Sequence, residues 1–330
     1  MPKNIAVIGS GGWGTAAAVH LSKLGHSVTL WSWVEEESNK LKANLENIDF
    51  LPGIELSPEI SFTSDISCVK NKDIIILVTP SKVIRSTARD MSEYVSKNAV
   101  VVILSKGIEN DSLKTLSEVV SEEIPQATVA VMSGPSHAEE VAREVPTTNI
   151  AACSDISKAE LIQSVFMSDN FRVYTGSDVL GVELGGALKN VIALCAGVLD
   201  GLGYGDNTKA ALMTRGMKEI TRLGVKMGAQ KDTFWGLSGI GDLIVTCTSM
   251  HSRNRRAGIL IGQGKTVDEA ISEVNMVVEG IVNCKAAYML SKKYNVDMPI
   301  VTEAYNVLYN NKKPKDAVLD LMARNKKNEN

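Results

Sequence analysis

The sequence has few residues of the kinds that bind metals or form disulfides. Its 330 residues include five cysteines and four histidines, and neither set has the spacing of a zinc site. The cysteines are odd in number and scattered, which argues against a disulfide framework. They are Cys68, Cys153, Cys195, Cys247 and Cys284. We therefore predict a cytoplasmic protein with reduced, mostly buried thiols and no metal.

An excess of positive charge and a continuous apolar segment are also lacking. The formal net charge is −3, which argues against a general nucleic-acid surface. The N-terminus lacks the apolar core of a signal peptide, and the most apolar stretch, 179–203, is interrupted by Glu183, Lys189, Asn190 and Asp200. We expect no nucleic-acid partner, no secretion signal and no membrane span. The composition, 44% hydrophobic and 22% charged, is that of a globular chain long enough for two domains.

The order of apolar patterns predicts those two domains. Short β-branched runs alternate with helical patterns, which is typical of βαβ units; the runs lie at 5–8, 27–30, 74–78, 100–104, 129–132 and 149–152. Long helical patterns then follow at 178–199, 208–227, 253–262, 267–274 and 279–293. The predicted fold class is α/β, with an N-terminal Rossmann-type parallel sheet domain (1–177) that binds a dinucleotide. An all-α C-terminal domain (178–330) follows, and its tail, 323–330, is expected to be solvated.

A glycine-rich turn follows the first predicted strand. Gly9, Gly11 and Gly14 fit G-x-G-x-x-G, which allows a tight turn, close approach of a pyrophosphate, and packing of helix on strand. The N-terminus of the next helix then faces the phosphates. The pattern predicts dinucleotide binding, and the alternative is a turn with only a structural role.

The end of the second predicted strand bears on the choice of cofactor. There an acidic residue would bind the ribose of NAD, and a nearby arginine would accept the phosphate of NADP. This chain reads Trp31-Ser32-Trp33-Val34-Glu35, with no basic residue, and Glu35 comes late enough to open the next helix. Trp33 could stack on adenine or cover apolar surface. We expect NAD or NADP as cofactor, with NADH at least as effective as NADPH unless Lys40 or Lys42 folds back.

One lysine interrupts an apolar helix. Residues 181–199 are apolar nearly all round, and Lys189 lies in their middle with no carboxylate three or four positions away. Burial lowers the pKa of an unpaired lysine toward values useful for proton transfer. Its amine is expected over Gly185 and Gly186, where absent side chains would leave room for a ligand. Lys189 is thus a candidate catalytic residue with Asn190 as a neighbouring donor; alternatively it reaches the surface or pairs with a distant acid.

Three arginines crowd the start of another predicted helix. Ser252 is a suitable N-cap, and Arg253, Arg255 and Arg256 follow it at once, although cations at this end oppose the helix dipole. The arrangement favours an anion such as a substrate phosphate, while at least one arginine is expected to form a salt bridge instead. Upstream, a glycine-flanked turn ends at Asp242, which could orient Lys189 or cap a helix.

Nine ordered segments together closely resemble the bacterial form of the NAD(P)-dependent glycerol-3-phosphate dehydrogenase family, over nearly the whole chain. They are GSGGWGTA (9–16), LPGI (51–54), LSKGIE (104–109), SGPSHA (133–138), ELGGALKNVIA (183–193), GYGDNTKAALMTRG (203–216), GIGDLIVTC (239–247), SRNRRAG (252–258) and VVEG (277–280). The resemblance implies reversible reduction of dihydroxyacetone phosphate to sn-glycerol 3-phosphate for phospholipid synthesis. A homodimer is also expected.

The resemblance implies roles for individual residues. Lys189 is the proton donor and acceptor, and Lys106 contacts both substrate and cofactor. The implied catalytic residues are Lys189, Lys106, Asp242, Asn190 and Thr246. The implied substrate-binding residues are Lys106, Gly134, Ser136, Lys189, Asp242, Ser252, Arg253 and Asn254. The implied cofactor-binding residues are Gly9, Gly11, Gly12, Trp13, Gly14, Trp33, Lys106, Ala138, Arg253, Val277 and Glu279.

The chain departs from the family pattern at two places. The family often has a basic residue just after the tryptophan that ends the second strand, where this chain has Ser32-Trp33-Val34. Position 137 is histidine where phenylalanine is common, and His137 has either a catalytic role or that of a neutral lining residue. Two rival functions stay open, a dehydrogenase of hydroxy acids and a nicotinamide sensor without catalysis. The three first-turn arginines and Lys106 favour a phosphate substrate over a hydroxy acid, and Lys106, Lys189 and Asp242 together argue against the sensor.

Overall fold

The computed structural model describes residues 1–326, 328 and 329; Lys327 and Asn330, which belong to the predicted solvated tail, lie outside the described residues. The chain divides into two compact units. Unit 1 comprises residues 1–109 and 114–183, and unit 2 comprises residues 110–113 and 184–330. Each unit is described by itself.

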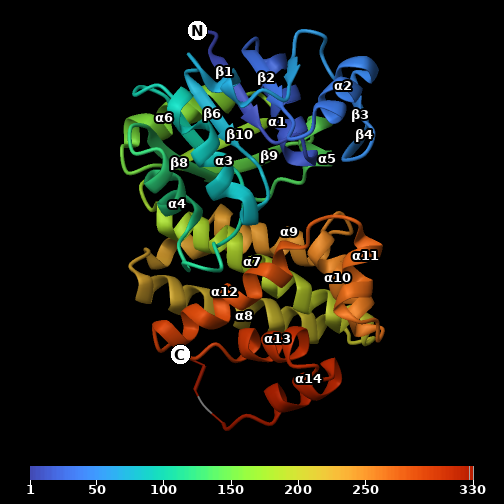
Figure 1. The fold of residues 1–330 in the computed structure, drawn as a ribbon. Coiled ribbons are helices and arrows are strands. Elements are labelled where there is room, and N and C mark those ends of the chain that lie inside the picture. Colours follow the sequence, from blue (N-terminus) through green and yellow to red (C-terminus); the bar gives the residue numbers. More distant parts are fainter. Residues whose placement is uncertain (327, 330) are drawn as a thin grey trace. The chain divides into compact units, whose positions relative to one another are not determined.

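Unit 1 is built on an eight-stranded sheet in the order β10-β9-β8-β7-β6-β1-β2-β5 (Figure 1). The strands are β1 (Asn4–Ile8), β2 (Ser27–Trp31), β5 (Ser61–Thr63), β6 (Ile74–Leu77), β7 (Val100–Ile103), β8 (Thr128–Ser133), β9 (Thr147–Ala152) and β10 (Phe171–Gly176). All six predicted strands are confirmed. The short edge strand β5 and the strand β10, whose residues alternate between buried and exposed, were not predicted because neither has a continuous apolar run.

The predicted parallel sheet is confirmed, with one antiparallel junction that the sequence did not indicate. β8 and β9 are antiparallel, while the other neighbouring strands of this sheet pair in parallel. The segment between Ser133 and Thr147 holds only the five-residue helix α5 (Ala138–Ala142). A parallel connection needs a crossover that carries the chain from the carboxyl end of one strand back to the amino end of the next. Here the chain instead enters β9 from the side of the sheet at which β8 ends. The fold is therefore α/β with a mainly parallel sheet.

Helices cover both faces of this sheet. They are α1 (Gly12–Lys23), α2 (Glu35–Asn44), α3 (Ile84–Met91), α4 (Leu116–Glu123) and α6 (Ile156–Phe166), and a small hairpin, β3 (Glu46–Asn47) and β4 (Leu51–Glu55), follows α2. In β1, Ile5 and Val7 join one apolar cluster with residues of α1 and α6. Ala6 and Ile8 join the other cluster, with residues of α3 and α4. Burial on both faces explains why the central strands are continuously apolar rather than alternating.

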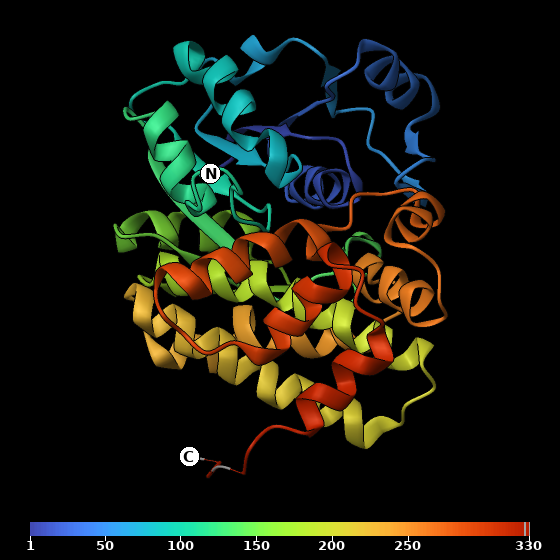
Figure 2. The ribbon, with the colours of Figure 1, turned by 60° about the horizontal axis from the view of Figure 1, so that its bottom comes forward.

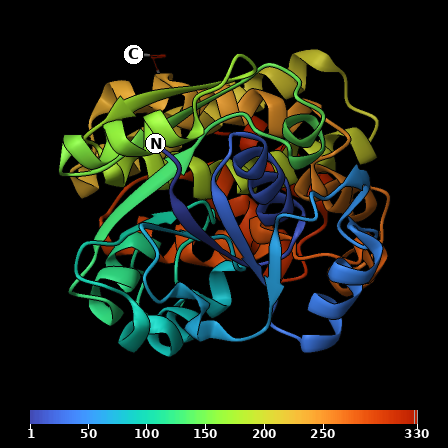
Figure 3. The same ribbon diagram turned by 90° about the horizontal axis from the view of Figure 1, so that it is seen from above.

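The order of the strands positions a ligand site. From β1 the chain passes to β2 and β5 on one side, and β6 then starts the other half of the sheet on the other side of β1 (Figure 3). In open sheets of this kind, ligands bind beyond the carboxyl ends of the strands where the strand order reverses. The turn at Gly9 lies at this point, since a Cβ on Gly9 would be 3.0 Å from the carbonyl carbon of Val78, just after β6.

Unit 2 is helical (Figure 2). Its helices are the main part of α7 (Val179–Gly201), then α8 (Asp206–Met227), α9 (Asp242–Thr248), α10 (Arg253–Gly262), α11 (Val267–Val274), α12 (Glu279–Lys293), α13 (Pro299–Tyr309) and α14 (Pro314–Met322). The five predicted helices are confirmed, three of them with the same bounds. α9 was not predicted because it follows a five-residue π-helical turn, Leu237–Gly241, whose glycines suggested a plain turn.

One helix among the described residues, α7, is long and apolar enough to cross a membrane. Within the fold, 83% of its most apolar stretch is buried. This is the burial expected of the core helix of a globular domain.

Candidate active site

The glycine turn after β1 gives each of its three glycines a different role. Gly9 adopts φ +120°, which favours glycine. A Cβ on Gly14 would lie 1.8 Å from the carbonyl oxygen of Gly9, so only glycine allows α1 to pack this close to the strand. A Cβ on Gly11 would meet no atom of the described residues within 4 Å. The turn is therefore tight at Gly9 and Gly14 and open at Gly11, where the backbone can approach a pyrophosphate.

The start of α1 fits an anionic group. Gly11 is its N-cap residue, and no side chain of the described residues caps the helix. The first N–H groups of an uncapped helix need an acceptor, and phosphate oxygens supply one. Gly12 and Ala138 lie close together beside this start, since a Cβ on Gly12 would be 3.7 Å from the Cβ of Ala138. Trp13 packs against the apolar cluster of α1. These residues fit a dinucleotide.

The end of β2 carries exposed aromatic surface next to an acidic helix. The side chain of Trp33 is 70% exposed, and its ring lies edge-on to that of Trp31 with the centroids 6.0 Å apart. Glu35 opens α2, as the sequence predicts. The acid that contacts the glycine turn is another one, because Glu37 Oε1 accepts a hydrogen bond of 2.8 Å from Ser10 Oγ. Sequence reasoning missed Glu37, although three consecutive acids at the start of a helix were a visible signal.

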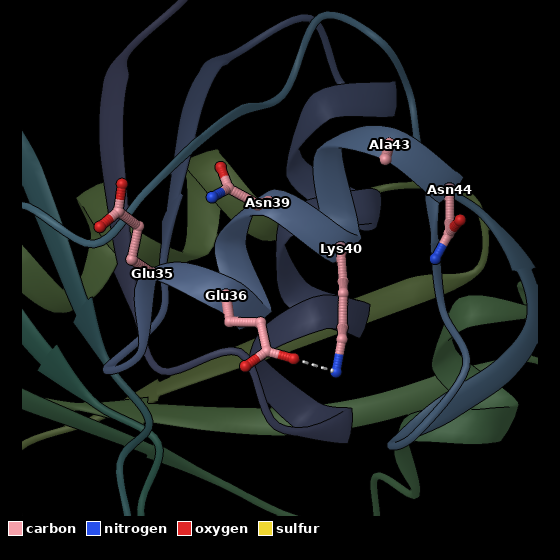
Figure 4. Close-up of a pocket in the computed structure, with 6 residues that line it drawn as sticks. All are labelled: Glu35, Glu36, Asn39, Lys40, Ala43 and Asn44. Carbon is pink, nitrogen blue, oxygen red and sulfur yellow. Dashed lines mark ion pairs between the residues drawn. The ribbon is translucent and has the colours of Figure 1, made fainter.

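A surface depression of about 480 Å³ lies along the outer face of α2 (Figure 4). All the residues that line it belong to that one helix; they are Glu35, Glu36, Asn39, Lys40, Ala43 and Asn44. Lys40 Nζ lies 2.8 Å from Glu36 Oε1, one helical turn away. None of these lining residues belongs to the glycine turn, so the depression is not part of the dinucleotide site indicated there.

Lys106, Gly134 and Ser136 come together near the carboxyl ends of β7 and β8. Lys106 Nζ and Ser136 Oγ each donate a hydrogen bond of 3.1 Å to the carbonyl oxygen of Gly134. Gly134 has φ +153°, and a Cβ there would lie 2.3 Å from Asn149 Oδ1, so the position requires glycine. Three residues implied by the family resemblance therefore form one polar cluster in unit 1.

His137 precedes α5 as its N-cap residue and is half-buried. Its carbonyl oxygen accepts hydrogen bonds from the backbone N–H groups of Glu140 and Val141. These bonds fix the backbone of His137 at the start of α5.

Lys189 is buried in α7 and held by two residues of α9. Its Nζ donates hydrogen bonds to Asp242 Oδ1 at 2.6 Å and to Thr246 Oγ1 at 2.5 Å. The exposed fractions of these three residues are 5%, 1% and 4%, respectively. Lys189 does not reach the surface, and it pairs with Asp242, the acid that the sequence offered either to orient it or to cap a helix. The amine is thus fixed in position in a buried site.

The expected ligand space over Gly185 is not there. A Cβ on Gly185 would lie 2.8 Å from the carbonyl oxygen of Ser238, so the backbone of the π-helical turn occupies that room. Sequence reasoning assigned the missing side chain to a ligand, whereas close packing of α7 against the turn before α9 requires it. This approach brings Asp242, which directly follows the turn, within reach of Lys189.

The surroundings of the lysine are strongly desolvated. Burial raises the pKa of the neighbouring Cys247 thiol to about 12, even though the charge of Lys189 acts in the opposite direction. Cys247 is therefore a neutral core thiol near neutral pH, and the Lys189–Asp242 pair lies in a medium where charge interactions are stronger than in water.

A chain of buried amides links three helices of unit 2. Asn254 Nδ2, on α10, donates to Asn190 Oδ1, on α7, at 3.0 Å, and Asn254 Oδ1 accepts from the backbone N–H of Gly280, on α12, at 2.8 Å. Asn283 Nδ2 donates to the carbonyl oxygen of Ala187 at 3.2 Å. Both ends of the Asn254 side-chain amide are thus held within the protein, which fixes the orientation of this side chain. Sequence reasoning did not identify Gly280 and Asn283 as parts of this network.

The start of α10 distinguishes its arginines. Ser252 is the N-cap residue, and its Oγ accepts a hydrogen bond of 3.2 Å from the backbone N–H of Arg255. Arg255 Nε lies 2.7 Å from Asp200 Oδ2, so Arg255 forms the salt bridge expected of at least one of these arginines. The side chain of Arg253 is exposed and that of Arg256 is half-buried. Arg253, the first residue of the helix, stays the predicted partner for an anion at this helix start.

Val277 and Glu279 flank the start of α12. Glu279 is the first residue of this helix and is half-buried, as is Val277. The hydrogen bond from Gly280 to Asn254 connects this segment with α10. The candidate residues therefore form two groups, one in each unit.

A metal site is not indicated in the described part of the chain, where no three histidine, cysteine or acidic side chains are grouped so that they could hold a metal ion. The five cysteines are unpaired thiols.

Comparisons with known proteins agree with these features. Residues 4–159 match the family model described as NAD-dependent glycerol-3-phosphate dehydrogenase N-terminus, and residues 178–319 match the model for the C-terminus of the same family. A glycerol-3-phosphate dehydrogenase (NAD(P)+) of Fusobacterium nucleatum is 54% identical over 326 residues, 98% of this chain and 97% of the relative. The enzyme of the same name from Agathobacter rectalis is 56% identical over 324 residues, 98% and 96% of the two chains.

A solved structure is also similar over its whole length. The crystal structure of glycerol-3-phosphate dehydrogenase from Coxiella burnetii superposes with a TM-score of 0.94 at 33% identity, covering 98% of this chain and 99% of that one. Both family models and these relatives agree on one family. The chain therefore belongs to the NAD-dependent glycerol-3-phosphate dehydrogenase family.

Proposed function

We propose that this chain catalyses the reversible reduction of dihydroxyacetone phosphate to sn-glycerol 3-phosphate, which supplies the backbone of phospholipids. As a member of its family it is an oxidoreductase that uses NAD or NADP. The observation that carries the proposal is the buried Lys189–Asp242–Thr246 arrangement, because a fixed ammonium is suited to an oxygen that gains negative charge.

The two domains have separate roles in this proposal. Residues 1–177 bind the dinucleotide at the glycine turn, and residues 178–330 supply the residues that act on the substrate. Bound NADH or NADPH supplies the hydride that reduces the carbonyl carbon. The remaining steps belong to residues of this chain.

Lys189 acts on the substrate oxygen. As the carbonyl carbon is reduced, negative charge develops on its oxygen, and the ammonium of Lys189 stabilises this charge and then donates a proton to it. The lysine is left as a neutral amine and takes up a proton before the next turnover. Asp242 and Thr246 hold Nζ in position. In the oxidation of glycerol 3-phosphate, the neutral amine accepts the hydroxyl proton.

The substrate phosphate binds at the start of α10. The N–H groups of the first turn, the helix dipole and Arg253 attract an anion there, and Ser252 fixes the end of the helix. The phosphate lies away from the reacting carbon, and its binding holds that carbon in place for the reaction. Asn254 contributes a contact with the substrate and, with Asn190, the amide chain described above.

The polar cluster of unit 1 completes the binding residues. Lys106, Gly134 and Ser136 contact the substrate, and Lys106 contacts the cofactor as well. The cofactor-binding residues in this proposal are Gly9, Gly11, Gly12, Trp13, Gly14, Trp33, Lys106, Ala138, Arg253, Val277 and Glu279. Trp33, whose ring is exposed, supplies a face for the adenine.

An absorbance assay tests the function and the cofactor preference together. Purified protein is mixed with dihydroxyacetone phosphate and either NADH or NADPH in one buffer, and oxidation of the cofactor is followed. We expect turnover, with kcat/KM for NADH at least equal to that for NADPH. Absence of turnover with both cofactors would overturn the proposed function. An advantage of about tenfold or more for NADPH, about 1.4 kcal/mol, would overturn the preference alone.

We also propose that the protein is a cytoplasmic homodimer. Large apolar side chains of unit 2 are exposed at Trp235, Ile244 and Met250, and such side chains are often covered in an assembly. Light scattering after size-exclusion chromatography measures the mass directly. A mass of one chain at micromolar concentration would contradict the dimer.

A further inference from the structure

We propose that Glu37 makes the dinucleotide site prefer NADH over NADPH, by placing a carboxylate where the 2′-phosphate of NADPH would lie. This inference rests on the proposed dinucleotide site. Its first support is the hydrogen bond of 2.8 Å that Ser10 Oγ donates to Glu37 Oε1. Ser10 lies within the glycine turn, and Glu37 lies in the first turn of α2. The carboxylate thus bridges the segments that follow β1 and β2.

The bridge is anchored on a fixed point. The carbonyl oxygen of Ser10 accepts hydrogen bonds from Asn47 Nδ2 at 2.7 Å and from Thr15 Oγ1 at 3.2 Å. Asn47 Nδ2 also lies 2.7 Å from Thr15 Oγ1, and all three residues are buried. The backbone of the turn is therefore held from α1 and from the hairpin after α2. A carboxylate bound to the hydroxyl of Ser10 is accordingly confined to the rim of the turn.

The location matches the place of the adenosine ribose. β1 and β2 are parallel neighbours with Ile8 opposite Trp31, and the backbone N–H of Gly9 donates to the carbonyl oxygen of Trp31 at 3.1 Å. In dinucleotide-binding domains, the ribose lies between the glycine turn and the end of the second strand, where an acid binds its hydroxyl groups. At this edge Glu37 can accept a hydrogen bond from the 2′-hydroxyl of NADH, whereas it repels a 2′-phosphate.

The charged neighbours of Glu37 lie on the outer face of α2. Glu35 and Glu36 share its helical turn, and Lys40 is paired with Glu36 across 2.8 Å on that face (Figure 4). Lys40 was one of the two lysines that could have folded back to bind a 2′-phosphate, and its partner here is Glu36 instead. Glu37 is the acid of this turn that is hydrogen-bonded to the glycine turn.

The alternative to a role in selectivity is that these acids only stabilise the helix. Carboxylates in the first turn stabilise a helix through its dipole, and Glu35, Glu36 and Glu37 share that effect. Only the place of Glu37 on the Ser10 hydroxyl gives it a role in selectivity. Glu35→Gln is therefore the matched control, because it removes one charge from the same turn and leaves the ion pair of Lys40 with Glu36 intact.

Equilibrium binding of NADH and NADPH to the full-length protein tests the proposal. Nucleotide fluorescence gives both dissociation constants for the wild type, Glu37→Gln, Ser10→Ala and the control Glu35→Gln. We expect Glu37→Gln to lower the ratio Kd(NADPH)/Kd(NADH) about tenfold, or about 1.4 kcal/mol. Ser10→Ala, which releases the carboxylate, lowers it in the same direction by a smaller factor, and the control leaves it within threefold.

The measured ratios distinguish a role of Glu37 in selectivity from a purely structural one. The proposal is overturned if the ratio in Glu37→Gln stays within threefold of the wild type, or if the control lowers it as much. If Glu37→Gln does not fold, the ratio in Ser10→Ala decides, and an unchanged ratio overturns the proposal. Binding needs no turnover, so a protein that shows this selectivity but does not reduce dihydroxyacetone phosphate would contradict the proposed function and leave the role of Glu37 intact.

Discussion

Lys189 and Asp242 form an ion pair that is almost completely shielded from water. Nζ lies 2.6 Å from Oδ1, and the side chains are 6% and 2% exposed. Removing one partner of such a pair leaves the other charge buried without compensation, which costs far more than loss of a surface pair.

Replacement of Asp242 should therefore impair catalysis severely. In Asp242→Asn the amide keeps the shape but no longer carries the charge that holds Nζ of Lys189 in position. We expect kcat to fall about a hundredfold or more, while the affinity for NADH, set by the glycine turn, changes little. Asp200→Asn is the matched control, because Asp200 pairs with Lys209 and Arg255 in the same unit. Equal losses of kcat in the two variants would contradict the special role of Asp242.

The buried amide chain predicts coupling between two asparagines. Asn254→Ala leaves Asn190 Oδ1 and the N–H of Gly280 without their partner, so α10 and α12 should shift relative to α7. We expect KM for dihydroxyacetone phosphate to rise about tenfold or more with a smaller change in kcat. A double-mutant cycle with Asn190→Ala measures the coupling, and strictly additive effects on KM would show that the two amides act independently.

The glycine turn predicts opposite results at two of its positions. In Gly14→Ala the new methyl group meets the carbonyl oxygen of Gly9, so the variant should be destabilised by several kcal/mol or fail to fold. In Gly11→Ala the methyl group meets open space, so stability should change little while the affinity for NADH falls. Thermal unfolding and NADH titration check both. Wild-type NADH affinity in Gly11→Ala would show that the open position does not face the dinucleotide.

A buried carboxyl should make the stability depend on pH. Glu219 Oε1 and Oε2, on α8, accept backbone N–H bonds from Ile300 and Val301 at the start of α13. Burial raises the pKa of Glu219 from 4.5 to about 7, against the effect of these hydrogen bonds; Arg222 lowers it and Asp297 raises it.

The sign of the effect follows from the raised pKa. Between pH 4.5 and about 7 the folded protein binds more of this proton than the unfolded chain, so the stabilising contribution is complete below pH 4.5 and is lost as the pH rises to about 7. The total is about 3 kcal/mol. Glu219→Gln removes this dependence, so urea unfolding at several pH values should show its stability rising relative to the wild type over that range. A constant difference across the range would contradict the prediction.

Much of the fold was predictable because its signals are local. The strands 5–8 and 74–77 are apolar on both faces of a covered sheet, and Ser252 caps α10 with its own hydroxyl. The turn from β8 into an antiparallel β9 was not predictable in the same way. It depends on where a short connection returns to the sheet, which is a property of tertiary structure.

In the candidate site, too, local features were predictable from the sequence and tertiary contacts were not. An unusual lysine in an apolar helix pointed to Lys189, but its partners lie 53 and 57 residues away, so the sequence could offer Asp242 only as one of several possibilities. Gly185 was interpreted as space for a ligand because a sequence does not reveal which backbone fills the gap. Glu37 was missed because the expected acid stands directly at the end of the strand, while here a hydroxyl of the glycine turn binds an acid from the following helix.

The rate of dihydroxyacetone phosphate reduction by Lys189→Ala tests the central claim most directly. The variant is compared with the wild type and with Lys209→Ala, which removes another ion-paired lysine of unit 2, and NADH binding is titrated in all three proteins. We predict that kcat falls about a hundredfold to ten-thousandfold in Lys189→Ala alone, with NADH affinity nearly unchanged, because the lost group acts at the substrate oxygen. Turnover close to that of the wild type in Lys189→Ala would show that another residue supplies the proton.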